Sequence, residues 1–231
     1  MSIAIGGLGV ESLDAWYGQA QVLRSVSVSV EEREVVGLFG HNGAGKSTLL
    51  RSIARLHKQS VGRVTFNGRD LTHLPAHEVA RGGVRLVREG GRVFDTMSVD
   101  DQVNLGARLS SRPRAQVLDE TYDLFPALKE RRKVLGGYLS GGQRQMLALA
   151  VALTGDPRCL LLDEPSTGLA HVIVDQVYAS LAILAERGVA LLIAEQTAAQ
   201  LVAICKRGYL LETGEIRAAG PPAEFLRTSE S

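Results

Sequence analysis

Residues 40–48 read GHNGAGKST, which matches the phosphate-binding pattern G-x-x-x-x-G-K-[ST] at every position. The preceding residues 34–39 form a short apolar run that is typical of a buried strand. The following residues place Leu49, Ile53 and Leu56 at helical spacing. Strand, glycine loop and helix in this order are the context that the pattern requires. The alternative is a chance glycine turn, which the match at every position and both flanks disfavour.

These residue types suit a polyphosphate ligand. The glycines let the backbone approach the ligand closely, with N–H groups pointing inward. The helix that starts there turns the positive end of its dipole toward the same phosphates. We expect Lys46 to reach the terminal phosphates and the Ser47 hydroxyl to hold a Mg²⁺ ion that bridges them.

The composition is that of an ordinary globular chain. Its 231 residues are 45% hydrophobic and 22% charged, which allows one domain over residues 1–231 with a sizeable core. The formal net charge of +1 gives no overall attraction to nucleic acid or to an anionic surface. The longest apolar stretches are too short to span a membrane, no signal peptide is recognisable, and two cysteines are too few for a disulfide framework. These features predict a reduced, cytosolic protein.

Other segments show strand and helix patterns. Alternating apolar and polar residues at 10–14 and 22–30 predict antiparallel strands. Helical patterns between about 98 and 133 predict a small helical insertion. The remaining expected elements are strands at 35–39, 84–87, 159–162 and 189–194, hairpins at 61–71 and 209–217, and helices at 144–153, 172–187, 201–205 and from 221.

Two further segments carry chemistry. Residues 139–143 read LSGGQ at a helix start, which is either a second anion-binding arrangement or simply a good N-cap. Asp163 and Glu164 follow the apolar strand at 159–162, and ligands bind at this end of the strands in open α/β sheets. The pair can be a salt-bridged loop start. Beside a phosphate loop, the carboxylate pair fits better with two roles, in which one carboxylate supports Mg²⁺ and the other acts as a base that activates water.

Taken together, these segments resemble the ATP-binding subunit of ABC transporters over nearly the whole chain, and LSGGQ is the motif that names that family. The resemblance implies an α/β fold with a P-loop NTPase core. This core has a mainly parallel central sheet, an antiparallel β subdomain and a small helical subdomain at about 95–145. It also implies ATPase activity with ATP and Mg²⁺. The residue roles that it implies are Tyr17 stacking on adenine; Asn42, Gly43, Ala44, Gly45, Lys46, Ser47 and Thr48 wrapping the phosphates; Asp163 supporting Mg²⁺; and Glu164 acting as the general base. From the residues alone, paired aromatics such as Trp16 and Tyr17 could equally be packing.

The same resemblance implies a dimer. One phosphate loop leaves a face of the γ-phosphate open, and in the family Ser140, Gly142 and Gln143 of a second subunit close that face. The loop 166–170 crosses between subunits. Because the chain has one phosphate loop, the partner is a second chain, identical or homologous. Further implied partners are membrane-spanning permease subunits and, indirectly, an extracytoplasmic solute-binding protein, without nucleic acid. The implied location is the cytoplasmic face of a bacterial cell membrane, as a peripheral protein.

Departures from the common pattern point to one branch of the family. Many members have glutamine where Glu89 stands and histidine where Gln196 stands. The segments around these residues look like those of ATPase subunits of branched-chain amino acid importers and their amide or urea relatives. Glu89 can ligate Mg²⁺ as a charge. Gln196 can donate a hydrogen bond to phosphate but cannot carry a proton, so we expect its part in catalysis to be positioning.

Other departures bear on coupling and turnover. Ala170 replaces a frequent aspartate of the cross-subunit loop, which removes a helix cap, and Arg33 stands where the family usually has a turn glycine. Residues 89–94 and the nearby helices should carry an apolar groove for a helix of the membrane subunit, although Phe94 could equally be core.

The sequence therefore predicts the ATP-hydrolysing subunit of an ABC importer that drives uptake of branched-chain amino acids or a similar small solute. Two alternatives stay open. One is a soluble ABC ATPase without a transport role, acting on nucleic acid or ribosomes. The other is a nucleotide-gated binding module with little turnover.

Overall fold

The computed structural model describes residues 6–196 and 199–226. A six-stranded sheet forms its centre, with the strand order β10-β9-β3-β8-β7-β6. All neighbouring strands in it are parallel except β9 and β10. The strands are β3 (Val35–Phe39), β6 (Val84–Val87), β7 (Cys159–Asp163), β8 (Ala190–Glu195), β9 (Arg207–Glu212) and β10 (Glu215–Gly220). The mainly parallel central sheet is therefore confirmed.

A second sheet packs beside the first and is antiparallel throughout, in the order β2-β1-β4-β5. Its strands are β1 (Leu8–Tyr17), β2 (Ala20–Val30), β4 (Ser60–Phe66) and β5 (Arg69–Asp70). The turn that leaves β2 toward β3 contains Arg33 with a φ of 63°, the left-handed region that glycine adopts more readily. The expected antiparallel subdomain is present, and Arg33 stands at a position with glycine-like backbone geometry.

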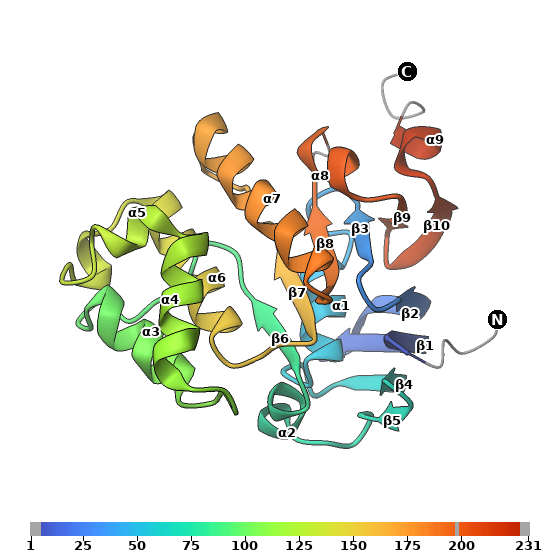
Figure 1. The fold of residues 1–231 in the computed structure, drawn as a ribbon. Coiled ribbons are helices and arrows are strands. Elements are labelled where there is room, and N and C mark those ends of the chain that lie inside the picture. Colours follow the sequence, from blue (N-terminus) through green and yellow to red (C-terminus); the bar gives the residue numbers. More distant parts are fainter. Residues whose placement is uncertain (1–5, 197–198, 227–231) are drawn as a thin grey trace.

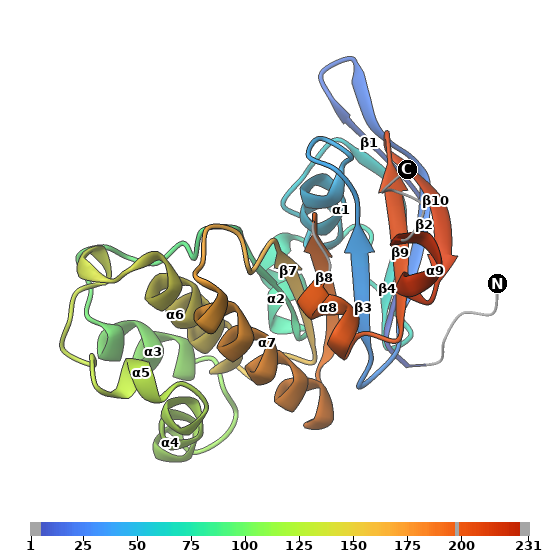
Figure 2. The same ribbon diagram turned by 90° about the horizontal axis from the view of Figure 1, so that it is seen from above.

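Helices cover both faces of the central sheet, as the view from above shows (Figure 2). The helices are α1 (Lys46–Ile53), α2 (Ala76–Arg81), α3 (Val99–Ala107), α4 (Arg114–Leu124), α5 (Pro126–Lys129), α6 (Gly141–Leu153), α7 (His171–Glu186), α8 (Ala199–Ile204) and α9 (Pro222–Leu226), with a 3₁₀ turn at Gly136–Tyr138. Because both faces are covered, β3 and β7 are buried along their whole length and read as continuous apolar runs. No helix in the described part of the chain is both long enough and apolar enough to span a bilayer.

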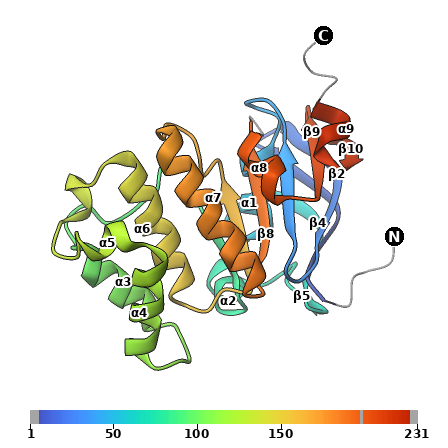
Figure 3. The same cartoon turned by 45° about the horizontal axis from the view of Figure 1, so that its top comes forward.

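Two apolar clusters hold the layers together. One lies between the two sheets and includes Leu49 and Ile53 of α1. The other lies under α6, α7 and α8 on the opposite face of the central sheet. Figure 3 shows α7 and α8 crossing that face, so the end of β3 that feeds the glycine loop is fixed from both sides.

The helices α3, α4 and α5 gather to one side of the sheets (Figure 1). They correspond to the expected helical insertion, whose boundaries at about 95 and 145 stay a prediction. One detail of the pattern was wrong: α1 ends at Ile53, and Leu56 lies beyond it with 56% of its surface exposed. The helix stops because Arg55 takes a left-handed φ of 58° and the Leu56 N–H donates to the Arg51 carbonyl at 2.8 Å.

Candidate functional site

The glycine loop connects β3 to α1 and has a backbone that side chains would obstruct. Gly45 has a φ of 110°, and a Cβ there would lie 2.7 Å from the Leu23 side chain. Gly43 has a φ of 82° and nothing within 4 Å of its Cβ position, so the middle of the loop faces open space. Helix α1 follows with no side-chain cap at its N-terminus, which leaves its first N–H groups to a ligand. The loop therefore has the geometry of an anion cradle.

Lys46 lies inside this loop. Its side chain is 4% exposed, and its Nζ donates to the Gly40 carbonyl at 2.7 Å and to the His41 carbonyl at 3.3 Å. The same Nζ forms an ion pair with Glu164 Oε1 at 3.1 Å. A buried ammonium group that contacts two backbone carbonyls and one carboxylate at the glycine loop is well placed to bind phosphate oxygens.

Ser47 and Asp163 meet across the two elements that carry them. The Ser47 Oγ donates to Asp163 Oδ1 at 2.8 Å, joining the start of α1 to the end of β7. Burial raises the pKa of the Asp163 carboxyl above its ordinary value, while the hydrogen bond from Ser47 and the charge of Arg51 lower it. A hydroxyl and a carboxylate beside a phosphate cradle are oxygen ligands of the kind that Mg²⁺ takes, with water and phosphate completing its shell. The residues present thus fit the ion.

Glu164 begins the loop after β7 in a strained conformation, with a φ of 45°. Its N–H donates to the Ala194 carbonyl at 2.9 Å, and its Oε2 accepts from the Thr167 hydroxyl at 3.0 Å. These bonds hold the carboxylate next to Lys46. Glycine loop, Lys46, Ser47, Asp163 and Glu164 therefore form one site, as the sequence predicts.

The LSGGQ segment, residues 139–143, is a complete capping box at the start of α6. The Ser140 Oγ accepts from the Gln143 N–H at 3.3 Å, and the Gln143 Oε1 accepts from the Ser140 N–H at 3.1 Å. A Cβ on Gly142 would lie 2.7 Å from the Ile173 side chain, so this glycine lets α6 and α7 approach closely. The segment is thus an N-cap of α6, and its part in binding an anion stays a prediction. In Figures 1 and 2, α6 lies away from α1, so this segment does not line its own glycine loop.

The other predicted site residues are not joined to the loop within the described part of the chain. Tyr17 ends β1 with 48% of its surface exposed, and its ring stacks obliquely on His57 with centroids 4.6 Å apart. Glu89 and Gln196 are exposed and form no hydrogen bond to Ser47, Asp163 or Glu164 there. The side chain of Tyr17 is thus available to a ligand, and the parts assigned to Glu89 and Gln196 stay predictions.

Phe94 is 61% exposed, which excludes the reading that it is ordinary core. It lines a groove of about 960 Å³ between α2, β6, α3 and α6. The apolar groove expected near residues 89–94 is therefore present.

Glu195, at the end of β8, is not among the site residues that the sequence predicts. This carboxylate is 2% exposed and accepts from the Tyr178 hydroxyl at 2.8 Å and from the Ser166 N–H at 3.1 Å. Burial raises the pKa of Glu195, and its two hydrogen bonds lower it. The available signal was a charged residue that ends the otherwise apolar strand Ala190–Glu195.

Comparisons with known proteins agree with this geometry. The sequence profile of the family described as "ABC transporter" matches residues 23–167. A high-affinity branched-chain amino acid transport ATP-binding protein, BraG of Pseudomonas aeruginosa, is 39% identical over 79% of this chain and 78% of its own length. The lipopolysaccharide export system ATP-binding protein LptB of Haemophilus influenzae is 30% identical over 96% of this chain and 94% of its own length. A crystal structure of a nucleotide-free ATP-binding cassette superposes with a TM-score of 0.84 at 23% identity, covering 97% and 95% of the two chains.

Proposed function

The chain belongs to the ATP-binding subunits of ABC transporters, which hydrolyse ATP, and on this premise we propose that it drives an importer of branched-chain amino acids or a similar small solute. The observation that carries the solute class is the 39% identity to a branched-chain amino acid transport protein over 79% of the chain. The chain is also 30% identical to a lipopolysaccharide export protein, so the direction of transport needs its own test.

The site supports ATP hydrolysis with Mg²⁺ in the following way. The loop amides and Lys46 bind the β- and γ-phosphates, with Lys46 exchanging its contact with Glu164 for phosphate oxygens. Ser47 and Asp163 would hold Mg²⁺, and the bound ion would neutralise the charge that develops on the phosphates. Glu164, released from Lys46, orients the attacking water and accepts its proton. Gln196 positions the γ-phosphate, and Tyr17 stacks on the adenine.

A second copy of the chain, or a homologous subunit, completes the pocket. The capping box of α6 presents Ser140 and its helix N-terminus on an exposed segment, away from the loop of the same chain. An exposed helix N-terminus favours negative charge. In the proposed pair, Ser140, Gly142 and Gln143 of one subunit face the γ-phosphate bound by the other.

The proposed complex also contains membrane-spanning permease subunits and, beyond them, an extracytoplasmic solute-binding protein. The ATPase would lie at the cytoplasmic face of the membrane through its contact with the permease. The groove lined by Phe94 supports that contact, because it is concave and exposes apolar side chains, as grooves that bind amphipathic helices do.

A binding module with slow turnover is the second candidate, and one observation favours it. Ala170 is the N-cap of α7 and gives that helix no side-chain cap, at the point where the loop would cross to the partner. Phosphate release measured beside ATP affinity separates the two candidates, since slow release with tight binding would favour the module.

Uptake of radiolabelled leucine and of urea tests the importer directly. Cells that lack the native subunit receive either this chain or its Glu164→Gln variant. We expect leucine uptake with the native chain and none with the variant. Uptake that is equal with both, while the purified chain hydrolyses ATP, would rule out the proposed transport role.

A further inference from the structure

The ring of Tyr17 lies on a turn beside the glycine loop. Ala15 of β1 pairs in register with Leu23 of β2, and the Leu23 side chain is the group that a Cβ on Gly45 would meet at 2.7 Å. Tyr17 stands two positions beyond Ala15, at the end of β1. The base of a nucleotide whose phosphates occupy the loop can therefore reach the exposed Tyr17 ring.

His57 supports this ring. The centroids of the two rings are 4.6 Å apart, with an angle of 48° between their planes. The His57 Nε2 lies 2.9 Å from the Trp16 carbonyl oxygen. Because a carbonyl oxygen only accepts, Nε2 carries a hydrogen and is the donor of this bond. The imidazole is thus anchored to the backbone of the residue before Tyr17 and packs against the Tyr17 side chain.

The chain around His57 is itself tied to the turn that carries Tyr17 and to α1. The Trp16 N–H donates to the Gln59 carbonyl at 2.9 Å, and the Gly18 N–H donates to Gln59 Oε1 at 3.1 Å. The His57 N–H donates to the Arg51 carbonyl of α1 at 3.2 Å, and α1 is the helix that begins at the glycine loop. These contacts fix the place of His57 between the turn and the helix.

We propose that His57 is a positioning residue of the base site, which holds the Tyr17 ring in the orientation that stacks on adenine. This inference rests on the proposed function, in which Tyr17 stacks on the base. An exposed aromatic ring loses rotational freedom when a base stacks on it, and a ring that is already held loses less. His57 therefore raises the affinity for ligands that have a base and leaves the affinity for a bare polyphosphate unchanged.

Two ligands separate these effects, namely ATP and inorganic tripolyphosphate, each titrated with Mg²⁺ into the full chain in a calorimeter. His57→Ala should weaken ATP binding about fivefold and leave tripolyphosphate binding unchanged, which also shows that the variant is folded. Tyr17→Ala should weaken ATP binding at least about tenfold. His73→Ala, at an exposed histidine, is the matched control and should change neither affinity.

The double variant Tyr17→Ala with His57→Ala shows whether His57 acts through the ring. We expect it to bind ATP as Tyr17→Ala does, because without the ring His57 has nothing to position. Wild-type ATP affinity in His57→Ala, an equal loss of affinity for tripolyphosphate, or additive losses in the double variant would overturn the inference. These results would leave the proposed function standing, since the uptake assay tests it separately. Wild-type ATP affinity in Tyr17→Ala would contradict the stacking itself and the inference with it.

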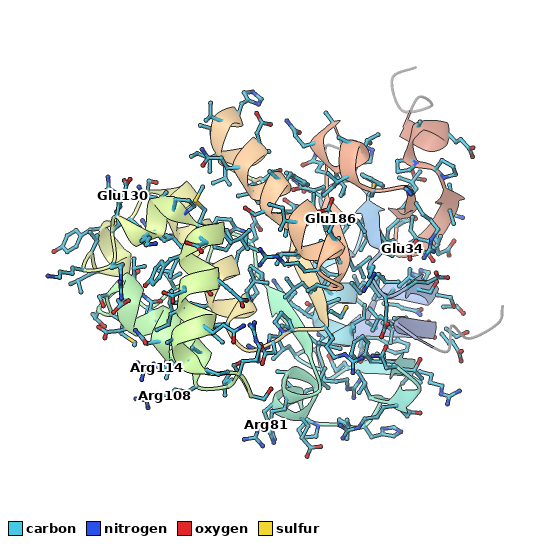
Figure 4. The ribbon with its side chains drawn as sticks, in the orientation of Figure 1. Glu34, Arg81, Arg108, Arg114, Glu130 and Glu186 are labelled. Carbon is cyan, nitrogen blue, oxygen red and sulfur yellow. The ribbon has the colours of Figure 1, made fainter. Side chains whose placement is uncertain are left out.

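A second inference concerns Glu195 and rests on different contacts. This buried carboxylate accepts from the Ser166 N–H at 3.1 Å and from the Tyr178 hydroxyl at 2.8 Å. Tyr178 comes from the middle of α7, which ends at Glu186 (Figure 4). The carboxylate therefore joins the end of β8 to the body of α7 and to the turn after β7.

That turn carries Glu164, the residue proposed as the base. The Thr167 hydroxyl donates to Glu164 Oε2 at 3.0 Å, and the Glu164 N–H donates to the carbonyl of Ala194, the neighbour of Glu195, at 2.9 Å. Glu164 has a strained φ of 45°, which its surroundings must maintain. We infer that Glu195 is a positioning residue that fixes the turn from Glu164 to Thr167 and thereby the direction of the Glu164 carboxylate.

Three variants test this role. Glu195→Ala should lower kcat about tenfold with little change in ATP affinity. Tyr178→Phe, which removes one donor to Glu195 and leaves the ring, should lower kcat by a smaller factor. Glu195→Gln retains an acceptor oxygen and should keep most of the activity. Wild-type kcat in folded Glu195→Ala and Tyr178→Phe, or an equal loss in Glu195→Gln and Glu195→Ala, would overturn the inference. Full activity of Glu164→Gln would instead contradict the proposed base, and with it the role of Glu195.

Discussion

Glu164→Gln should destabilise the nucleotide-free protein and make its stability more dependent on nucleotide. Lys46 Nζ lies 3.1 Å from Glu164 Oε1, with side-chain exposures of 4% and 13%. The variant keeps an oxygen that can accept a hydrogen bond but removes the charge. Lys46 then has only the Gly40 and His41 carbonyls and a neutral amide for an ammonium group that is out of water.

The size of the effect follows from this geometry. At 3.1 Å the Coulomb attraction is about 5 kcal/mol with an effective dielectric constant of about 20. Desolvation of both groups cancels much of it, and the amide replaces part of the hydrogen bond. We therefore expect a loss of about 2 kcal/mol in the free energy of unfolding. In a chain of this length, that loss lowers Tm by about 4–8 °C.

Thermal unfolding with and without a non-hydrolysable ATP analogue measures the effect. The γ-phosphate supplies the charge that Glu164 supplied, so the difference in Tm between variant and wild type should shrink when the analogue and Mg²⁺ are present. Glu78→Gln is the control, since its pair with Arg69 spans 3.7 Å and is exposed. It should change the free energy of unfolding by less than about 0.5 kcal/mol. Equal Tm values for wild type and Glu164→Gln without nucleotide would refute the reasoning.

Four further perturbations have defined outcomes. Gly45→Ala should abolish binding of a fluorescent ATP analogue, because a residue with a Cβ does not tolerate the φ of 110° and would meet Leu23 at 2.7 Å; wild-type affinity would contradict the cradle. Leu161→Ala should lower the free energy of unfolding in urea by about 2–5 kcal/mol, because this β7 side chain is 0% exposed. Leu56→Ala, at a side chain that is 56% exposed, should change it by less than about 0.5 kcal/mol. Glu195→Gln should be more stable than wild type at pH 8, and the gain should disappear as the pH falls toward about 4. The sign follows because burial raises the pKa of Glu195 in the folded state, so its charge opposes folding above that pKa, whereas glutamine has no charge. A gain that does not change with pH in urea unfolding would contradict it.

Much of the fold could be read from local patterns. The run before the glycine loop and the run at 159–162 are apolar because both faces of the central sheet are covered, and such runs predict buried parallel strands. The contact between Ser47 and Asp163 was also predictable, because parallel strands bring their carboxyl ends to one edge of the sheet. Helix ends were harder to place. Leu56 continues the apolar spacing of α1, but the left-handed Arg55 ends the helix before it.

The features that the sequence pattern could not predict depend on contacts between residues far apart in the chain. Glu195 of β8 accepts hydrogen bonds from the Tyr178 hydroxyl of α7 and from the Ser166 N–H in the loop after β7. Tyr178 is 17 positions and Ser166 is 29 positions from Glu195 in the sequence. The exposure of Phe94 depends on how α3 and α6 lie relative to β6, and composition alone does not decide it. The contact of Lys46 with Glu164 joins the start of α1 to the loop after β7, and the phosphate-loop pattern describes only the first of these segments.

The claim that two copies share each ATP site can be tested by mixing two inactive variants. Lys46→Ala removes the phosphate contact of one chain, and Ser140→Arg blocks the segment that would face the partner's nucleotide. In a mixed pair, the intact loop of the Ser140→Arg chain meets the intact 139–143 segment of the Lys46→Ala chain. We expect each variant alone to hydrolyse almost no ATP and the mixture to regain activity at one site per pair. Full activity of Ser140→Arg alone, or a mixture as inactive as its components, would contradict it.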